Sequence, residues 1–365
     1  MKYEARHVDW ASVRRVLVIK LRHHGDVLLT TPVLRTLKQQ MPQVEVDVLV
    51  YDETRDMLAD NPHIDRLFTI KKTRAAGGSW AKLKLELGLL RDLRARQYDV
   101  LISLTEHNRG ASLARLLRPR WAISQDGPYN GFYKRSFSHL FQPVWLNKRH
   151  AVERNLDALR TIGLFPRDED KTATLVPGAA AQQTITALLA THGLAAGGYI
   201  LVHPGSRWAY KTWTAEKVAG LIAQLMEEGH RIVVSGSPDG AERALADAIL
   251  AALPQRDQVV DVVGRLSLRE LGELIRQSRM LIGVDSVPMH MAAALNTPVV
   301  ALFGPSGQIE WGPWGGTHRI IRLGLPCQPC ELKGCGNSGY SQCLATLPIA
   351  TVHAAAIELL QLKAD

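Results

Sequence analysis

Residues 13–51 read VRRVLVIKLRHHGDVLLTTPVLRTLKQQMPQVEVDVLVY. The first part, VRRVLVIKL (13–21), is a mostly apolar run rich in valine, which is typical of a strand buried in a parallel sheet. After the turn RHHGDV, residues 28–42 show helical spacing and end at a proline, and VEVDVLVY (44–51) indicates a second strand. A strand, a helix and a strand in this order predict a parallel sheet with right-handed crossovers.

The same alternation continues along the chain. It predicts further strands at 98–105, 199–205, 231–238, 280–286 and 298–305, and further helices at 80–97, 214–230, 240–254, 267–279 and 287–296. The chain has 365 residues, more than one ordinary hydrophobic core holds. We therefore expect an α/β protein with two doubly wound domains, at 1–175 and 176–350, and a C-terminal helix at 351–365.

The positive charge lies in the first half of the chain. Residues 1–150 hold 26 Lys and Arg against 15 Asp and Glu, whereas the remainder holds 18 against 20. A basic half typically meets an anionic partner, such as nucleic acid, acidic lipid, or a phosphorylated or carboxylated substrate. The alternative is that the charge serves solubility alone.

Composition and hydropathy predict a cytoplasmic protein. The apolar fraction of 46% and the charged fraction of 22% are those of a globular protein. No stretch reaches the ~20 apolar residues that span a bilayer, and the N-terminal residues lack the apolar core of a signal peptide. We expect at most a peripheral contact with the membrane surface, through weak attraction of the basic half to anionic lipid.

Ligands of open parallel sheets bind at the carboxyl ends of the strands. Lys20-Leu21-Arg22-His23-His24-Gly25-Asp26 follows the first predicted strand, and its glycine allows a tight turn close to a ligand. Asp26 has two interpretations. It could cap the next helix, or it could take a proton from a sugar hydroxyl as a general base, which positioning rather than an unusual pKa makes effective.

Two strand ends in the second half have the residues of a diphosphate site. Ser206 and Lys211 follow one strand, where a hydroxyl and an ammonium can bind phosphate oxygens. Asp285, Ser286 and His290 follow another, where a helix begins at once and its free amides attract phosphate. Taken singly, the lysine could be surface charge and the histidine a packed core residue.

A third strand end, Ser235-Gly236-Ser237-Pro238, precedes Glu242. Its glycine suggests close approach of the backbone to a ligand. Glu242 either binds a ribose hydroxyl or lies solvated on its helix.

Four cysteines, Cys327, Cys330, Cys335 and Cys343, lie within 17 residues. Disulfides are rare in the cytoplasm. The four thiols either close a tetrahedral structural zinc site, although their spacing is tighter than two CxxC pairs, or stay reduced in a compact loop.

Several segments resemble the ADP-heptose:lipopolysaccharide heptosyltransferases. They are VLVIKLRHHGDVLLTTPVLRTLKQQMP, HPGSRWAYKTW and LIGVDSVPMHMAAALNTPVVALFGPS, in the family's order. DVLVYDETRDMLADNPHIDRL, SQDGPYNGFYKRSFSHL and HAVERNLDALRTIGL are similar to the heptosyltransferase III branch, which adds the side-branch heptose of the inner core.

The resemblance implies a GT-B fold, with two Rossmann-like domains facing across a cleft. It implies an acceptor-binding N-terminal domain for anionic lipopolysaccharide inner core, at the cytoplasmic face of the inner membrane, and a donor-binding C-terminal domain. It also implies an inverting, metal-independent transfer of heptose from ADP-L-glycero-β-D-manno-heptose, with no required cofactor.

The resemblance also assigns roles to residues. Asp26 resembles the family's general base, and Lys211 the lysine that stabilises the departing diphosphate. Asp285, Ser286 and His290 match the donor-binding segment, Ser206 matches a hydroxyl residue of the phosphate loop, and Glu242 is placed at the ribose. Lys20, Arg22 and His24 flank Asp26 and are assigned to the acceptor.

Two other functions fit parts of the sequence. One is a GT-B glycosyltransferase or epimerase that uses a UDP- or GDP-sugar, because no strand-end motif identifies the base. The other is a non-catalytic nucleotide or nucleic-acid binding module. Against nucleic acid stand the absence of a helix-turn-helix pattern and an aromatic content of 6% without basic-aromatic interleaving.

Overall fold

The computed structural model describes residues 7–71, 79–142 and 149–362. The chain divides into two compact units, Met1–Thr174 and Leu175–Asp365. This division lies one residue from the boundary that the sequence predicts. Residues 1–6 and 363–365, which belong to the predicted N-terminal domain and C-terminal helix, lie outside the described part.

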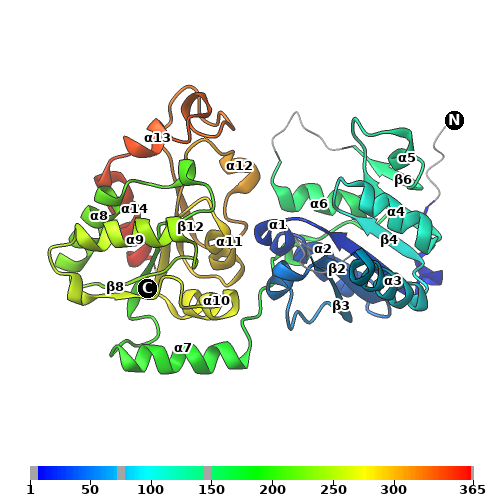
Figure 1. Cartoon of the computed structure of the whole chain (residues 1–365), viewed down its shortest axis with the longest axis horizontal. Helices are drawn as coiled ribbons and strands as arrows, with labels where there is room; N and C mark the ends of the chain where they lie inside the picture. The colour runs from blue at the N-terminus through cyan, green and yellow to red at the C-terminus, as the bar shows by residue number, and fades with distance from the viewer. Residues whose placement is uncertain (1–6, 72–78, 143–148, 363–365) are drawn as a thin grey trace. The chain divides into compact units, whose positions relative to one another are not determined.

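The first unit is built on a six-stranded sheet whose order is β3-β2-β1-β4-β5-β6 (Figure 1). All its neighbouring strands are parallel. The strands are β1 (Arg15–Lys20), β2 (Glu45–Tyr51), β3 (Arg66–Ile70), β4 (Val100–Ser103), β5 (Trp121–Gln125) and β6 (His139–Phe141). The α-helices of the unit are α1 (His24–Leu28), α2 (Thr31–Gln40), α3 (Ser79–Arg96), α4 (Asn108–Leu117), α5 (Gly131–Lys134) and α6 (Ala151–Arg160). The 3-10 helices are η1 (Trp10–Ser12), η2 (Asp52–Met57) and η4 (Asp168–Lys171).

The second unit repeats this plan with the order β12-β11-β10-β7-β8-β9, again with parallel neighbours only. The strands are β7 (Tyr199–His203), β8 (Arg231–Val234), β9 (Val259–Asp261), β10 (Met280–Val284), β11 (Val299–Leu302) and β12 (His318–Ile321). The α-helices are α7 (Ala179–Thr191), α8 (Ala215–Glu227), α9 (Gly240–Ala251), α10 (Leu268–Gln277), α11 (Val287–Ala294), α12 (Gln308–Trp311), α13 (Gln342–Ala345) and α14 (Ile349–Gln361). The 3-10 helices are η5 (Ala209–Lys211), η6 (Arg256–Gln258) and η7 (Cys335–Asn337). The C-terminal helix α14 packs on α8 and β12 of this unit.

Both sheets have the Rossmann strand order. Numbered from its own first strand, each unit follows 3-2-1-4-5-6, with the reversal between β1 and β4 in the first sheet and between β7 and β10 in the second. The expected fold, two doubly wound Rossmann-like domains, is confirmed. In sheets with this strand order, ligands bind beyond the carboxyl ends of the strands, at the point where the order reverses.

Some predicted elements have different bounds. The helix expected at 28–42 is two helices, α1 and α2, because Pro32 lies in the first turn of α2 and begins a new helix there. Residues 54–61, whose spacing also suggests a helix, overlap the 3-10 helix η2. The strands β3, β5, β6, β9 and β12 are not predicted, because each is short and forms no long apolar run.

Each sheet is covered by its own apolar core. Val16, Leu17, Val18 and Ile19 of β1 are fully buried, as expected for a strand covered on both faces. Among the described residues, no helix combines the length and apolar composition needed to cross a bilayer.

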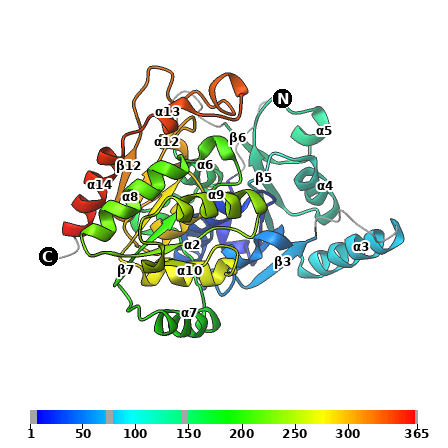
Figure 2. The same ribbon diagram turned by 60° about the vertical axis from the view of Figure 1, so that its left-hand side comes forward.

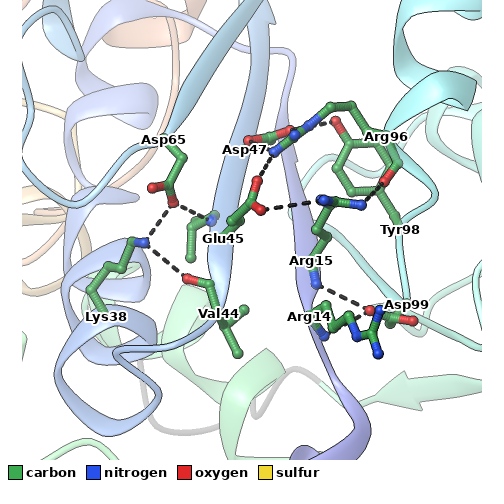
Figure 3. A network of polar contacts seen from close by, with 11 residues as sticks. Arg14, Arg15, Lys38, Val44, Glu45, Asp47, Asp65, Arg96, Tyr98 and Asp99 are labelled. Carbon is green, nitrogen blue, oxygen red and sulfur yellow. Dashed lines mark hydrogen bonds and ion pairs between the residues drawn. The ribbon is translucent and has the colours of Figure 1, made fainter.

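A buried ionic network lies where the strands of the first sheet begin (Figure 3). Asp47, within β2, is fully buried, and its carboxylate accepts hydrogen bonds from Arg96 Nε at 2.7 Å and from the Tyr98 hydroxyl at 2.8 Å. Arg96 also pairs with Glu45 at the start of β2. The hydrogen bond to Asp47 raises the pKa of Arg96, and burial raises the pKa of Tyr98. The network thus connects the end of α3 to the start of β2 and to the chain entering β4.

We predict that Asp47→Ala lowers the free energy of unfolding of the first unit by about 3–5 kcal/mol, because Arg96 would keep a buried charge without its main partner. Asp92→Ala is the matched control, since Asp92 and its partner Arg91 are both exposed, and it should change stability by no more than about 0.5 kcal/mol. Urea denaturation with equal m-values measures both. Equal midpoints for the two variants would contradict the prediction.

Candidate functional site

A lysine-aspartate pair spans the reversal point of the second sheet. Lys211 lies in η5, in the segment after β7, and Asp285 directly follows β10. Lys211 Nζ lies 2.6 Å from Asp285 Oδ2, and the aspartate side chain is buried. An ammonium has three N–H donors, so this contact leaves two with which Lys211 can bind an anion. The structure therefore brings together two residues that lie 74 positions apart and that the sequence assigns to one site.

The helix after Asp285 begins as the sequence predicts. Ser286 is the residue before the first turn of α11, and its hydroxyl makes no cap hydrogen bond to that turn. It contacts the Val284 carbonyl at 3.3 Å instead. His290 lies one turn into the helix and is buried. Ser286 thus lies at the positive end of the α11 dipole, beside Asp285, where an anion is stabilised.

Glu242 is held against two glycine turns. It lies in the first turn of α9, and its Oε2 accepts the Ser237 N–H at 2.9 Å. A Cβ atom on Gly205 would lie 2.3 Å from this oxygen, and one on Gly236 would lie 3.4 Å from it. The side chain is 11% exposed, so Glu242 is not a solvated surface residue. Its position beside the carboxyl ends of β7 and β8 suits a carboxylate that binds a ligand hydroxyl.

His203, the last residue of β7, lies beside Glu242. Its Nδ1 lies 2.9 Å from Ser235 Oγ, and its Nε2 lies 3.8 Å from Glu242 Oε2. Burial lowers the pKa of His203 to about 4, while the Glu242 carboxylate acts in the opposite direction. His203 is therefore neutral at pH 7 and can support Glu242 without adding charge. Nothing in the spacing of the sequence indicates this role of His203.

Ser206 takes part in the turn that follows β7. Its Oγ accepts the Trp208 N–H at 3.4 Å, and the residue is half-buried. It lies within the same segment as Gly205 and Lys211. Its phosphate role stays a prediction.

In the first unit, Asp26 lies in α1, directly after β1. The residue that precedes the first turn of this helix is His23, and Asp26 is the third residue within it. Among the described residues, the Asp26 carboxylate has no hydrogen bond or ion pair, so it does not cap α1 with its side chain. It is half-buried. A carboxylate that no partner occupies, at the reversal point of the sheet, is placed to accept a proton from a ligand.

Lys20, the last residue of β1, lies beneath this position. It is 8% exposed, and its ammonium donates to the Leu104 carbonyl at 3.0 Å and to Asn155 Oδ1 at 3.2 Å. Burial lowers the pKa of Lys20, and the nearby Asp26 carboxylate acts in the opposite direction. Lys20 thus joins the ends of β1 and β4 to α6 and leaves little surface for a large acceptor.

The other residues assigned to the acceptor differ in their contacts. Arg22 is exposed and lies 3.5 Å from Glu106. His24 Nε2 lies 2.8 Å from the Glu53 carbonyl, which joins α1 to η2. Their acceptor role stays a prediction. The sequence does not predict the contacts of Glu106 and Asn155 with this edge of the sheet. Each is a single polar residue, in a loop or a helix, and no sequence spacing distinguishes it from other polar residues.

The four cysteines of the loop lie near one another, since the other three all act on the pKa of Cys343. Among the described residues, no group of three His, Cys, Asp or Glu side chains is arranged to hold a metal ion, and the four cysteines are free. Cys343 is buried in α13, whereas Cys327 and Cys335 are exposed. Burial raises the pKa of the Cys343 thiol, and the Cys335 sulfur accepts the Gln342 N–H at 3.4 Å. Structural zinc in this loop stays a prediction.

Two Rossmann-like units, each with charged side chains at the carboxyl edge of its sheet, are the architecture of the GT-B class of glycosyltransferases. The profile of glycosyltransferase family 9 (heptosyltransferase) matches residues 87–341. The chain belongs to this family.

Its relatives are named for heptose transfer. Lipopolysaccharide heptosyltransferase 3 of Escherichia coli K12 is 35% identical over 308 residues, which cover 83% of this chain and 86% of that protein. The structure of E. coli ADP-heptose LPS heptosyltransferase II matches with a TM-score of 0.77 and 22% identity, over 96% of this chain and 100% of that one. E. coli heptosyltransferase WaaC with ADP matches with a TM-score of 0.75 and 21% identity, over 94% and 99%. At these identities the two structures support the fold, and the expected resemblance to heptosyltransferase III is confirmed by sequence.

We predict that the imidazole of His203 does not titrate between pH 7 and pH 5. Its folded pKa of about 4 lies below the ordinary value of 6.5, so only the unfolded chain gains this proton as the pH falls below 6.5. The associated stability is complete above pH 6.5 and is lost as the pH falls toward 4, by up to about 3 kcal/mol. NMR titration of the histidine ring protons, with His203→Gln to identify the resonance, measures this. A midpoint above pH 6 would refute it.

Proposed function

We propose that this protein is an inverting glycosyltransferase that moves heptose from ADP-L-glycero-β-D-manno-heptose to the lipopolysaccharide inner core, as a heptosyltransferase III. The 35% identity to lipopolysaccharide heptosyltransferase 3 over most of both chains supports the substrate class. The observation that carries the mechanism is the Asp26 carboxylate, which no described partner occupies at the end of β1.

Asp26 is the proposed general base. It takes the proton of the acceptor hydroxyl while the oxygen of that hydroxyl forms a bond to the anomeric carbon of the donor. The bond from this carbon to the diphosphate oxygen breaks in the same step, so the anomeric configuration inverts and ADP leaves. Lys20, close by, contributes a buried positive charge that stabilises the Asp26 carboxylate in its position.

The second unit is proposed to bind the donor. Lys211 stabilises the charge that develops on the departing diphosphate, and Asp285 holds its ammonium in place. The amide end of α11, where Ser286 lies, and the Ser206 hydroxyl complete the phosphate site. His290 extends this site along α11. These groups provide the charge stabilisation that a metal ion provides in other transferases, so we propose that no metal or cofactor is required.

Glu242 is proposed to bind the ribose. Its Oε2 already accepts the Ser237 N–H, which leaves Oε1 to accept a hydroxyl of the sugar. His203 supports the carboxylate from the other side. A ribose contact does not select the base, so a UDP- or GDP-sugar is the competing donor.

The first unit is proposed to bind the anionic acceptor at the cytoplasmic face of the inner membrane. Its excess of Lys and Arg complements the phosphates and carboxylates of inner core, and Arg22 and His24 lie beside Asp26 to receive them. Family membership argues against a nucleic-acid binding module as the source of this charge.

We predict transfer from ADP-heptose to heptosylated, Kdo-containing core acceptor, with no transfer from UDP- or GDP-sugars and no effect of EDTA. Asp26→Asn should lower turnover about 100-fold or more while ADP binds as in the wild type, because the amide cannot take the proton. Mass spectrometry of the acceptor and calorimetry with ADP measure the two quantities. Activity with only another nucleotide sugar would exclude the heptose assignment, and near-normal turnover of the variant would exclude Asp26 as the base.

We predict that Gly205→Ala weakens ADP binding about tenfold or more. The new Cβ would lie 2.3 Å from the end of the Glu242 side chain, which can swing away without unfolding the chain but then leaves the ribose site. Gly240→Ala is the matched control, because a Cβ there meets nothing within 4 Å. Calorimetric titration with ADP compares the two. Equal affinities would show that the position of Glu242 does not matter for the nucleotide.

A further inference from the structure

The first half of helix α3 exposes an apolar stripe that no core of its unit covers. Trp80 is 83% exposed, Leu83 47% and Leu87 55%. Their spacing of three and four residues places them on one side of the helix. Leu89, Leu90 and Leu93, in the second half of the helix, pack in or against the core of the sheet, and Leu85, which is 59% exposed, lies off the stripe. Packing within the unit therefore does not explain the stripe.

Cationic side chains continue this outer face. Lys84, Arg91 and Arg94 are exposed. Of the two carboxylates of α3, Glu86 pairs with Arg109 and Asp92 pairs with Arg91. The charge of the outer face that remains unpaired is thus positive. It lies within one or two helical turns of the apolar stripe. The helix as a whole is not strongly amphipathic. A tryptophan and leucines next to lysine and arginine are nevertheless the side chains that anchor proteins at the membrane interface.

The connection from β3 to α3 places the stripe at the carboxyl edge of the first sheet. The helix connects the carboxyl end of β3 to the amino end of β4, and its last residue, Arg96, pairs with Glu45 at the start of β2. Glu86 pairs with Arg109, in the first turn of α4 after β4. Trp80 precedes Glu86 by six residues and therefore projects about 9 Å farther. Figure 2 shows the first turns of α3 extending away from the sheet of their unit.

We propose that the first turns of α3, with Trp80, Leu83 and Leu87 as the inserting stripe and Lys84 and Arg94 as its cationic flank, dock this protein on an anionic lipid bilayer. The edge from which α3 projects is also the edge that carries Lys20 and Asp26. A bilayer contacted there would present a lipid-anchored acceptor to the side of the unit that holds the base. This last step rests on the proposed function, whereas the docking surface does not.

Flotation with vesicles of equal parts phosphatidylcholine and phosphatidylglycerol tests the surface. Wild-type protein should float at low salt, and Trp80→Ser/Leu83→Ser/Leu87→Ser should lower the partition coefficient about tenfold or more. Leu116→Ser/Phe132→Ser/Phe165→Ser, which removes three other exposed apolar side chains of the same unit, should float as the wild type does. Lys84→Gln/Arg94→Gln should weaken flotation at low salt and have little effect at high salt.

Three results would contradict the proposed docking surface. In the first, the wild-type protein does not float with the vesicles. In the second, the stripe variant floats as well as the wild type, and in the third, the apolar control loses flotation as much as the stripe variant does. A wild-type dimer in sedimentation that the stripe variant converts to monomer, without flotation, would assign the stripe to a second copy of the chain instead.

Transfer assays separate this proposal from the proposed function. The stripe variant should act normally on a deacylated, water-soluble acceptor and slowly on the same acceptor anchored in vesicles. If no heptose is transferred in either assay but flotation follows the expected pattern, the function is wrong and the surface stands. If transfer succeeds equally in both assays and flotation is unchanged, the function stands and the surface is wrong.

Discussion

The parallel pairing of every strand is the constraint on which the rest of the structure depends. Because all neighbours in both sheets run in one direction, each sheet collects all its strand ends at a single edge. Residues that are far apart in sequence are brought together there. Lys211 and Asp285 meet across the reversal of the second sheet, and Lys20 meets the Leu104 carbonyl across the reversal of the first.

The two edges of the first sheet use charge in opposite ways. At the amino edge, Asp47 is buried and its oxygens are taken by Arg96 and Tyr98, so its charge supports the fold (Figure 3). At the carboxyl edge, the Asp26 carboxylate is half-buried and no described partner occupies it. The partners of Asp47 use its oxygens for the fold, whereas the proposed function uses the Asp26 carboxylate, beside the buried Lys20, for a ligand. Helix α3 runs between these edges, and its last turns are part of the core while its first turns are not.

The second sheet shows how neutral groups position a charged one. His203 is kept neutral by burial, so it can lie beside Glu242 without a competing positive charge. Gly205 and Gly236 provide the space in which the carboxylate lies. Burial of Glu242 costs little because the Ser237 N–H compensates one of its oxygens. The proposed donor site therefore depends on the residues that position Glu242.

By itself, the sequence determined the fold class, the main strands and helices, the uneven charge and the strand-end residues, because apolar periodicity and local glycine chemistry are properties of neighbouring residues. Its segments also carried the likeness to heptosyltransferases. Only the tertiary structure decided that Lys211 pairs with Asp285 and that the Glu242 side chain lies mostly covered beside His203. Only it decided that the Asp26 carboxylate meets no partner among the described residues. It also decided that the apolar side chains in the first turns of α3 are exposed. These outcomes depend on contacts between distant segments, which spacing along the chain does not encode.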